Sequence, residues 1–187
     1  MWTNSRLLFT ALVGVVAATR LAELRISRRN VRHLRARGGV ERGARHYPWM
    51  VALHSGWLVA APAEVWLARR PLVPALAVAM LLLLAAGIGL RLWAITTLGE
   101  RWTTRVVVVP DAPLVGRGPY RWLRHPNYVG VSIEIVALPL IHTAWLTALL
   151  FGAANVLLLR VRIAVEEAAL AQSGVEQPST RGGCTFR

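Results

Sequence analysis

The sequence predicts an all-α integral membrane protein with about five transmembrane helices, the last two forming a tight helical hairpin. Hydrophobic residues make up 55% of the 187 residues, and the mean hydropathy is +0.46. Residues 71–90 form an uncharged stretch that at ~1.5 Å per residue crosses a ~30 Å hydrocarbon core. The 22 basic residues, all arginine, outnumber the 9 acidic residues and cluster between the apolar segments. This composition excludes a disordered chain and is typical of a membrane protein.

The first apolar segment, residues 7–19, reaches spanning length only if the helix continues through Arg20 and Glu23 to Leu24. Arg20 and Glu23 are three residues apart, so on one face of that helix they are expected to form an ion pair. A secretory signal peptide is the alternative interpretation of this segment.

The remaining spans are separated by charged and turn-forming residues. Tyr47 opens the second span as an interfacial anchor. Residues 128–159 are mainly apolar but too long for one span, and Pro139, with the polar His142 and Thr143, divides them into a hairpin. The predicted spans after the first are residues 47–63, 71–90, 128–141 and 144–165.

The arginines orient these spans. Loops 25–46 and 99–127 and the C-terminal segment fall on one side of a five-span bundle, which carries 19 of the 22 arginines. By the positive-inside rule this side faces the cytoplasm and the N-terminus lies outside. We therefore expect a multi-pass protein embedded in the lipid bilayer. Nucleic acid is not an expected partner, because the basic loops carry few aromatic residues on which bases could stack.

Residues 1–171 are expected to form a single transmembrane domain, followed by a flexible tail at 172–187. Glu134 lies within the fourth predicted span, where an ionisable side chain is costly. It is expected either to hydrogen-bond to a neighbouring helix or to face a pocket, and the sequence favours neither. The oligomeric state is left open.

Residues 116–130, GRGPYRWLRHPNYVG, predict a basic loop that runs into a helix. Pro126 suits the first helical position, which places Tyr128 in the first turn. The free N–H groups of that turn, with His125 beside them, could receive an anionic group of a ligand. Gly130 allows a ligand or a neighbouring backbone to approach closely. A basic loop on the membrane surface is the simpler alternative.

Residues 160–167, RVRIAVEE, close the last span. Arg162 and Glu166 are four residues apart on one helix face, and Glu167 is adjacent. Two carboxylates and an arginine at the same membrane face as His125 could bind a zwitterionic cofactor. An ordinary charge cluster at a helix end is the alternative.

The run GPYRWLRHPNYVG at 118–130, followed thirty residues later by RVRIAVEEAAL at 160–170, resembles the isoprenylcysteine carboxyl methyltransferase family. The wider group, which includes phospholipid methyltransferases, shares an RHPxYxG-like stretch followed by a pair of glutamates. The stretch at 20–54 is similar to a bacterial branch of the family, some members of which O-methylate alkylpyrones or alkylresorcinols. After Leu170 the chain departs from the family, whose members commonly continue into another helical stretch that contains aromatic residues.

The resemblance implies S-adenosylmethionine as the methyl donor, bound at the cytoplasmic face. Glu166 and Glu167 would hold its amino and ribose groups, and Arg162 would face either the cofactor carboxylate or the acceptor. The other residues implied to form the cofactor pocket are His125, Pro126, Tyr128 and Gly130.

The implied acceptor is a lipophilic small molecule or a lipidated molecule that enters from the bilayer. An ionised carboxylate needs no base, whereas a phenol or enol with a pKa near ~10 benefits from a base or from a cation beside its oxyanion. Arg162, His125 and Glu134 are the candidates for that catalytic role, in this order. Alternative functions are a phospholipid N-methyltransferase, an NADPH-dependent sterol-type reductase, and a non-catalytic membrane protein.

Overall fold

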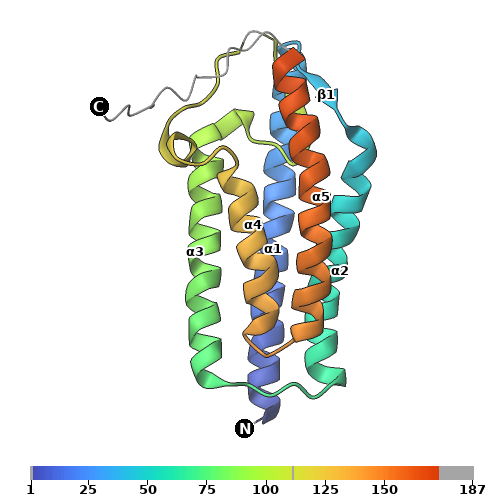
Figure 1. The fold of residues 1–187 in the computed structure, drawn as a ribbon, viewed down its shortest axis with the longest axis vertical. Coiled ribbons are helices and arrows are strands. Elements are labelled where there is room, and N and C mark those ends of the chain that lie inside the picture. Colours follow the sequence, from blue (N-terminus) through green and yellow to red (C-terminus); the bar gives the residue numbers. More distant parts are fainter. Residues whose placement is uncertain (1, 111, 173–187) are drawn as a thin grey trace, which may run out of the picture.

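Five helices run alongside one another along the long axis of the molecule (Figure 1). The computed structural model describes residues 2–110 and 112–172. Four of the helices it describes are long and apolar enough to cross a membrane, and α4, with 15 residues, is shorter. The prediction of an all-α membrane protein is confirmed. The helices are α1 (Trp2–Ala36), α2 (Tyr47–Leu67), α3 (Pro74–Leu98), α4 (Pro126–Leu140) and α5 (Trp145–Gln172).

Helix α1 is longer than predicted. Residues 25–36, expected to begin a loop, continue the helix, and no glycine or proline interrupts residues 15–37. One face of this extension is buried through Val31 and Leu34, which are 8% and 4% exposed. On the same face, Asn30 donates hydrogen bonds of 3.1 and 2.8 Å to backbone oxygens of the segment after α3. The predicted loop was wrong because these tertiary contacts hold the charged segment in a helix.

Helices α4 and α5 form the predicted tight hairpin. Thr143 in the connection has φ +54°, and its hydroxyl donates a 2.7 Å hydrogen bond to the backbone oxygen of Pro71. Glu64 of α2 accepts hydrogen bonds from the backbone N–H groups of Leu146 and Thr147, at 3.2 and 2.7 Å. These N–H groups belong to the first turn of α5, where they have no partner within the helix. Glu64 therefore caps α5 and ties it to α2.

The longer connections meet at the opposite end of the bundle from this hairpin turn (Figure 1). There β1 (Val40–Arg42) pairs antiparallel with β2 (Val106–Val108), a ribbon too short to leave a pattern in the sequence. Glu41 accepts hydrogen bonds from Arg35 and Arg105. Burial raises the pKa of the Glu41 carboxyl, but these two hydrogen bonds outweigh burial, so the pKa lies below its ordinary value.

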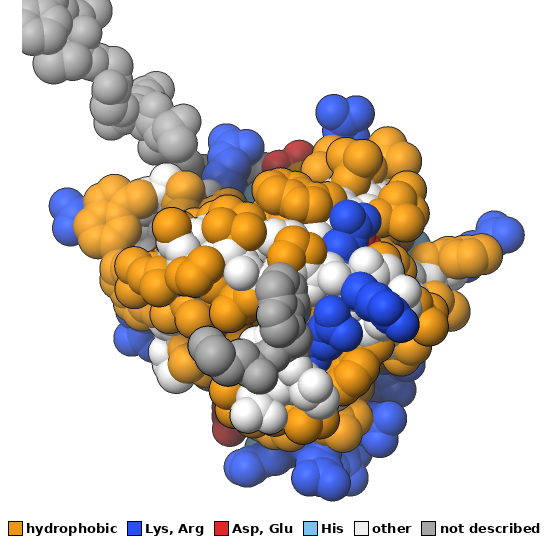
Figure 2. All heavy atoms as spheres, turned by 90° about the horizontal axis from the view of Figure 1, so that it is seen from below, with side chains coloured by type: hydrophobic (Ala, Val, Ile, Leu, Met, Phe, Trp, Pro, Cys, Tyr) orange, Lys and Arg blue, Asp and Glu red, His pale blue; other side chains and the backbone are white. Residues whose placement is uncertain are grey.

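The interior is apolar and the outer surface is too. Trp57 of α2 is fully buried, and its indole N–H donates a 3.0 Å hydrogen bond to the backbone oxygen of Ile135 in α4. Outward-facing leucines such as Leu8, Leu82 and Leu149 are 68–72% exposed. Seen from the end where α1 begins, hydrophobic side chains cover most of the molecule (Figure 2). Apolar surface on this scale suits a lipid environment.

The tail expected at 172–187 lies outside the described residues, apart from Gln172, which is the last residue of α5.

Candidate active site

A cavity of about 710 Å³ lies at the end of the bundle where α1 and α5 end. This volume is in the range typical of sites for cofactors and small molecules. Its walls come from the end of α3 and the chain that leads through β2, from η3 (Gly118–Arg121), from the start of α4, and from the C-terminal part of α5. The cavity brings the two sequence motifs together. The lining residues from these motifs include His125, Asn127, Tyr128, Arg162, Glu166 and Glu167.

Tyr128 lies between two charged residues of α5. Its hydroxyl donates a hydrogen bond to the Glu166 carboxylate and accepts one of 2.7 Å from Nε of Arg162. The guanidinium also lies over the Tyr128 ring, 5.4 Å from the ring centre. Arg162 is 3% exposed, and its Nη1 donates to Sδ of Met50 in α2 at 2.8 Å. Among the described residues, the link expected between Arg162 and Glu166 therefore runs through Tyr128.

Glu167 faces the loop that precedes α4. Its carboxylate lies 3.5 Å from Nε2 of His125 and 3.9 Å from Nη1 of Arg124, and its side chain is 44% exposed. The His125 ring stacks on Tyr128, with the ring centres 5.3 Å apart. This carboxylate thus lies near the Arg124 guanidinium and the His125 ring and remains accessible from the cavity.

Asn127 is a lining residue that sequence reasoning did not select. Its side-chain oxygen is buried and accepts no hydrogen bond from the described part of the chain. A buried polar atom without a partner is costly, so this oxygen is suited to a donor on a bound molecule. The available signal was its place in the first turn of α4, directly after Pro126.

Two residues predicted for the cofactor pocket support its walls without lining it. Pro126 is buried at the first position of α4, as expected. Gly130 faces α3, where a Cβ atom would lie 2.5 Å from Cγ of Arg91 and 2.8 Å from the backbone oxygen of Gly87. The close approach that Gly130 permits is therefore between α3 and α4.

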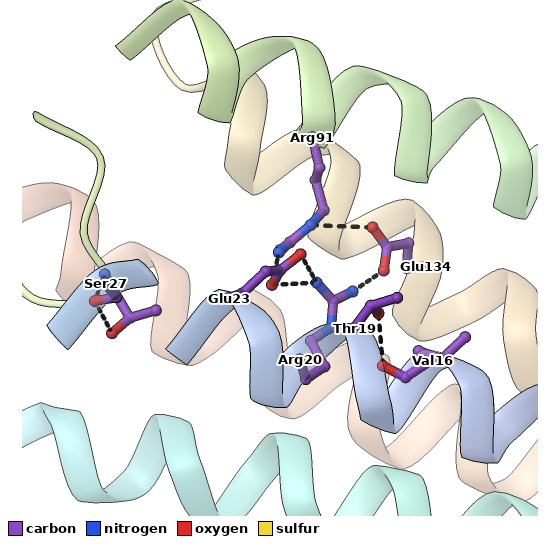
Figure 3. Close-up of polar contacts among 8 residues, drawn as sticks. Val16, Thr19, Arg20, Glu23, Ser27, Arg91 and Glu134 are labelled. Atoms are coloured by element: carbon purple, nitrogen blue, oxygen red, sulfur yellow. Dashed lines mark hydrogen bonds and ion pairs between the residues drawn. The ribbon is translucent and has the colours of Figure 1, made fainter. Parts of the chain in front are cut away.

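Glu134 also lies outside the cavity lining, in a group of four side chains that we term the buried charge cluster (Figure 3). Arg20 hydrogen-bonds to Glu23 at 2.9 Å, which is the predicted pair, and to Glu134. Arg91 of α3 hydrogen-bonds to Glu23 and lies 3.2 Å from Glu134. Glu134 is 1% exposed and Arg91 is 5% exposed. Of the two roles considered for Glu134, the structure shows contact with neighbouring helices.

An apolar part of the cavity lining was not predicted. Val106, Val108, Leu114 and Leu170 contribute to it. Val106 and Val108 belong to β2 and Leu114 to the irregular chain after it, and neither the three-residue strand nor this chain leaves a periodic pattern in the sequence. Tyr120 lines the cavity beside them, and burial, with the Glu166 charge nearby, raises the pKa of its phenol, which therefore stays protonated at neutral pH.

Comparison with known proteins shows the family of the chain. The model of the isoprenylcysteine carboxyl methyltransferase (ICMT) family matches residues 77–172, which contain both motifs. The chain belongs to this family. It is a membrane methyltransferase by family and by its apolar helices. The resemblance stated from the two motifs is confirmed at the level of the family.

Two bacterial relatives extend the likeness beyond the matched range. The chain is 36% identical over 170 residues to YpbQ, an uncharacterized protein of Bacillus subtilis (strain 168), and the match covers 90% of this chain and 100% of the relative. It is 28% identical over 156 residues to an uncharacterized protein of Haemophilus influenzae, over 83% of this chain and 90% of that protein.

Proposed function

We propose that this protein transfers a methyl group from S-adenosylmethionine to an oxygen atom of a lipophilic acceptor held in the membrane. Methyltransferases of the ICMT family use this cofactor. The observation that carries the proposal is the composition of the cavity lining, which combines a buried arginine and two carboxylates with apolar residues such as Val106 and Leu114. A zwitterionic cofactor and an apolar acceptor together require these two kinds of surface.

The charged side of the cavity fits the cofactor. Glu166 and Glu167 would accept hydrogen bonds from its amino group and ribose hydroxyls, and the free oxygen of Asn127 offers a further acceptor. His125, stacked on Tyr128, would close this side of the site. The cofactor supplies a methyl group that is already activated, so the protein has mainly to position the reactants and exclude water.

Arg162 is the residue to which we assign stabilisation of the acceptor oxygen. Its guanidinium is buried and hydrogen-bonds to the Tyr128 hydroxyl. An ionised carboxylate could be methylated beside it without a base, and a phenol or enol would lose its proton more readily next to a fixed cation. Glu134 is engaged with Arg20 and Arg91, so we assign no proton transfer to it.

We also propose that the cavity opens to the cytoplasm, with the N-terminus outside the plasma membrane of a bacterium. The support is the excess of arginines at the end of the bundle where the cavity lies. The acceptor would then enter sideways from the bilayer and the cofactor from the water phase.

Calorimetric titration of S-adenosylmethionine into the detergent-purified protein tests the cofactor assignment. We expect Glu167→Gln to weaken binding about tenfold to a hundredfold, because a charge-assisted hydrogen bond contributes ~1.5–3 kcal/mol. Glu100→Gln is the matched control, because this side chain is 53% exposed, pairs with His33 and Arg37, and does not line the cavity. No binding to the wild type would overturn the proposal, and equal weakening in the two variants would contradict the site.

Transfer of a labelled methyl group identifies the acceptor. Prenylcysteine analogues, alkylresorcinols with alkylpyrones, and phosphatidylethanolamine are the classes to compare. We expect label in an O-methyl group, where a base-labile ester indicates a carboxylate acceptor and a base-stable ether indicates a phenol or enol. Ether formation on alkylresorcinols would support the predicted bacterial branch. Label on the amine of phosphatidylethanolamine would replace the proposal with N-methylation.

A further inference from the structure

We infer that the outer face of the α1 extension binds the headgroups of acidic phospholipids. This face carries Arg25, Arg28, Arg29 and Arg32, which we term the arginine stripe. All four residues are exposed. Their spacing of three, four and seven residues places them on one side of the helix, opposite the buried Val31 and Leu34.

The part of the chain that the structure describes supplies no counter-charge to the stripe. None of its four arginines forms an ion pair within residues 2–110 and 112–172, and the acidic side chains at this end of α1 are bound elsewhere. Glu23 belongs to the buried charge cluster, Glu41 pairs with Arg35 and Arg105, and Glu100 pairs with His33 and Arg37. Four neighbouring guanidinium groups without carboxylates are suited to phosphate oxygens, which they can bind through paired hydrogen bonds.

The stripe lies at the depth of lipid headgroups. The outward apolar surface of α1 includes Leu21 and Ile26, which are 59% and 46% exposed, so it ends where the stripe begins. Each headgroup layer is about 5–7 Å thick, and Arg25 to Arg29 span about 6 Å of helix. Arg32 lies about 10 Å along the helix from Arg25, and its long side chain can reach the same layer because helical side chains tilt toward the N-terminus. Trp93 and Trp122, 46% and 68% exposed with ring centres 5.8 Å apart, provide an aromatic pair of the kind found at membrane interfaces.

The opposite face of the same helical segment forms hydrogen bonds to a segment that lines the cavity. Ser27 accepts a 2.9 Å hydrogen bond from the backbone N–H of Thr104, and Asn30 donates 2.8 Å to the backbone oxygen of Trp102. Trp102 and Thr103 line the cavity. Headgroups bound to the stripe would therefore restrain the part of α1 to which the cavity-lining segment is hydrogen-bonded. Lipid binding should for this reason stabilise the folded protein.

Thermal unfolding in neutral detergent, titrated with phosphatidylglycerol or phosphatidylcholine, tests this inference without any activity measurement. We expect phosphatidylglycerol to raise the unfolding midpoint of the wild type with saturation, and phosphatidylcholine to have little effect. Changing all four stripe arginines to Gln should raise the half-saturating phosphatidylglycerol concentration at least tenfold, because each arginine near an acidic surface contributes roughly fivefold. Arg→Lys changes should retain most of the response.

A control variant separates the stripe from general charge. It changes four exposed arginines outside the stripe to Gln, and its response should stay within twofold of the wild type. These control positions are Arg42, Arg45, Arg117 and Arg160. Where the fourfold stripe variant does not fold, Arg28→Gln with Arg29→Gln should weaken the response at least fivefold. Equal losses in stripe and control variants, or equal effects of the two lipids on the wild type, would overturn the inference.

Discussion

The buried charge cluster and the cavity both place arginine and glutamate side chains from neighbouring helices close together, yet they differ in how those charges are used. In the cluster, Arg20 and Arg91 each contact both Glu23 and Glu134. The cavity leaves its charges less fully paired. Arg162 contacts the Tyr128 hydroxyl and the Met50 sulfur, and the Glu167 side chain is 44% exposed.

The difference shows that a charge within a membrane span is not enough to indicate a reacting group. The cluster has two positive and two negative side chains from α1, α3 and α4, so it neutralises itself while it joins three helices (Figure 3). The cavity keeps Arg162, Glu166 and Glu167 facing a space that can take a ligand. How completely the protein itself satisfies a charge is therefore the better criterion of function.

The largest effect is expected from breaking the cluster. Glu134→Gln leaves the buried Arg91 and the part-buried Arg20 with one carboxylate, and removal of one member of a buried ion pair costs ~3–5 kcal/mol. Glu167→Gln, at the accessible end of the cavity, should change the free energy of unfolding by less than ~0.5 kcal/mol. Unfolding curves in detergent measure both. A Glu134→Gln protein that is as stable as the wild type but no longer binds S-adenosylmethionine would reverse the roles given to the two regions.

The next effect concerns the cation of the cavity. Arg162→Gln should lower kcat/KM about a hundredfold to a thousandfold, since loss of one group that stabilises a developing oxyanion has effects of this size. Arg162→Lys keeps the positive charge but lacks the planar guanidinium with its several N–H donors, so it should retain part of the activity. Activity is measured with the acceptor found by methyl labelling, and cofactor binding by calorimetry confirms that the site is intact. Unchanged kcat/KM in the Gln variant would remove Arg162 from the mechanism.

A smaller effect is expected from the hydroxyl that joins the cavity charges. Tyr128→Phe removes the hydrogen bonds to Arg162 and Glu166 but keeps the ring, so cofactor affinity should fall about tenfold, as for the loss of ~1.5 kcal/mol. Tyr47→Phe is the matched control, because Tyr47 lies outside the cavity lining and its hydroxyl is 3.4 Å from the Thr104 hydroxyl. Equal affinities for Tyr128→Phe and wild type would show that the bridging hydroxyl does not position the carboxylate.

The sequence predicted most of the fold because the bilayer imposes long apolar helices, which are visible as uncharged runs. It also predicted the Arg20–Glu23 pair, because helical spacing alone brings these side chains together. It did not show that Arg91 and Glu134 complete a cluster, since that contact depends on how α3 and α4 pack around Gly130. The end of α1 was misplaced because its charged segment is held by tertiary contacts through Asn30.

The candidate site, too, could be predicted from the sequence only in part. Both motifs could be assigned to one membrane face, and the structure brings His125 and Glu167 to 3.5 Å. The apolar lining around Val106 and Leu114 could not be predicted, because a three-residue strand and the irregular chain after it leave no periodic signal. Tyr128 was selected by resemblance, whereas its position between Arg162 and Glu166 follows from the packing of α4 against α5.

The smallest effect tests a third set of charges, on the water side of the bundle. Glu41 joins Arg35 and Arg105, and its pKa lies below the ordinary value of 4.5. Its stabilising contribution is therefore present above the pKa of the unfolded chain and is lost as the pH falls through the lower pKa of the folded protein. Both arginines are more than a third exposed, at 57% and 38%, so screening should limit the effect of Glu41→Gln at pH 7 to about 1 kcal/mol or less. In unfolding midpoints measured from pH 7 to 3, the difference between wild type and Glu41→Gln should shrink in acid, and a constant difference would show that the carboxylate charge does not stabilise the ribbon.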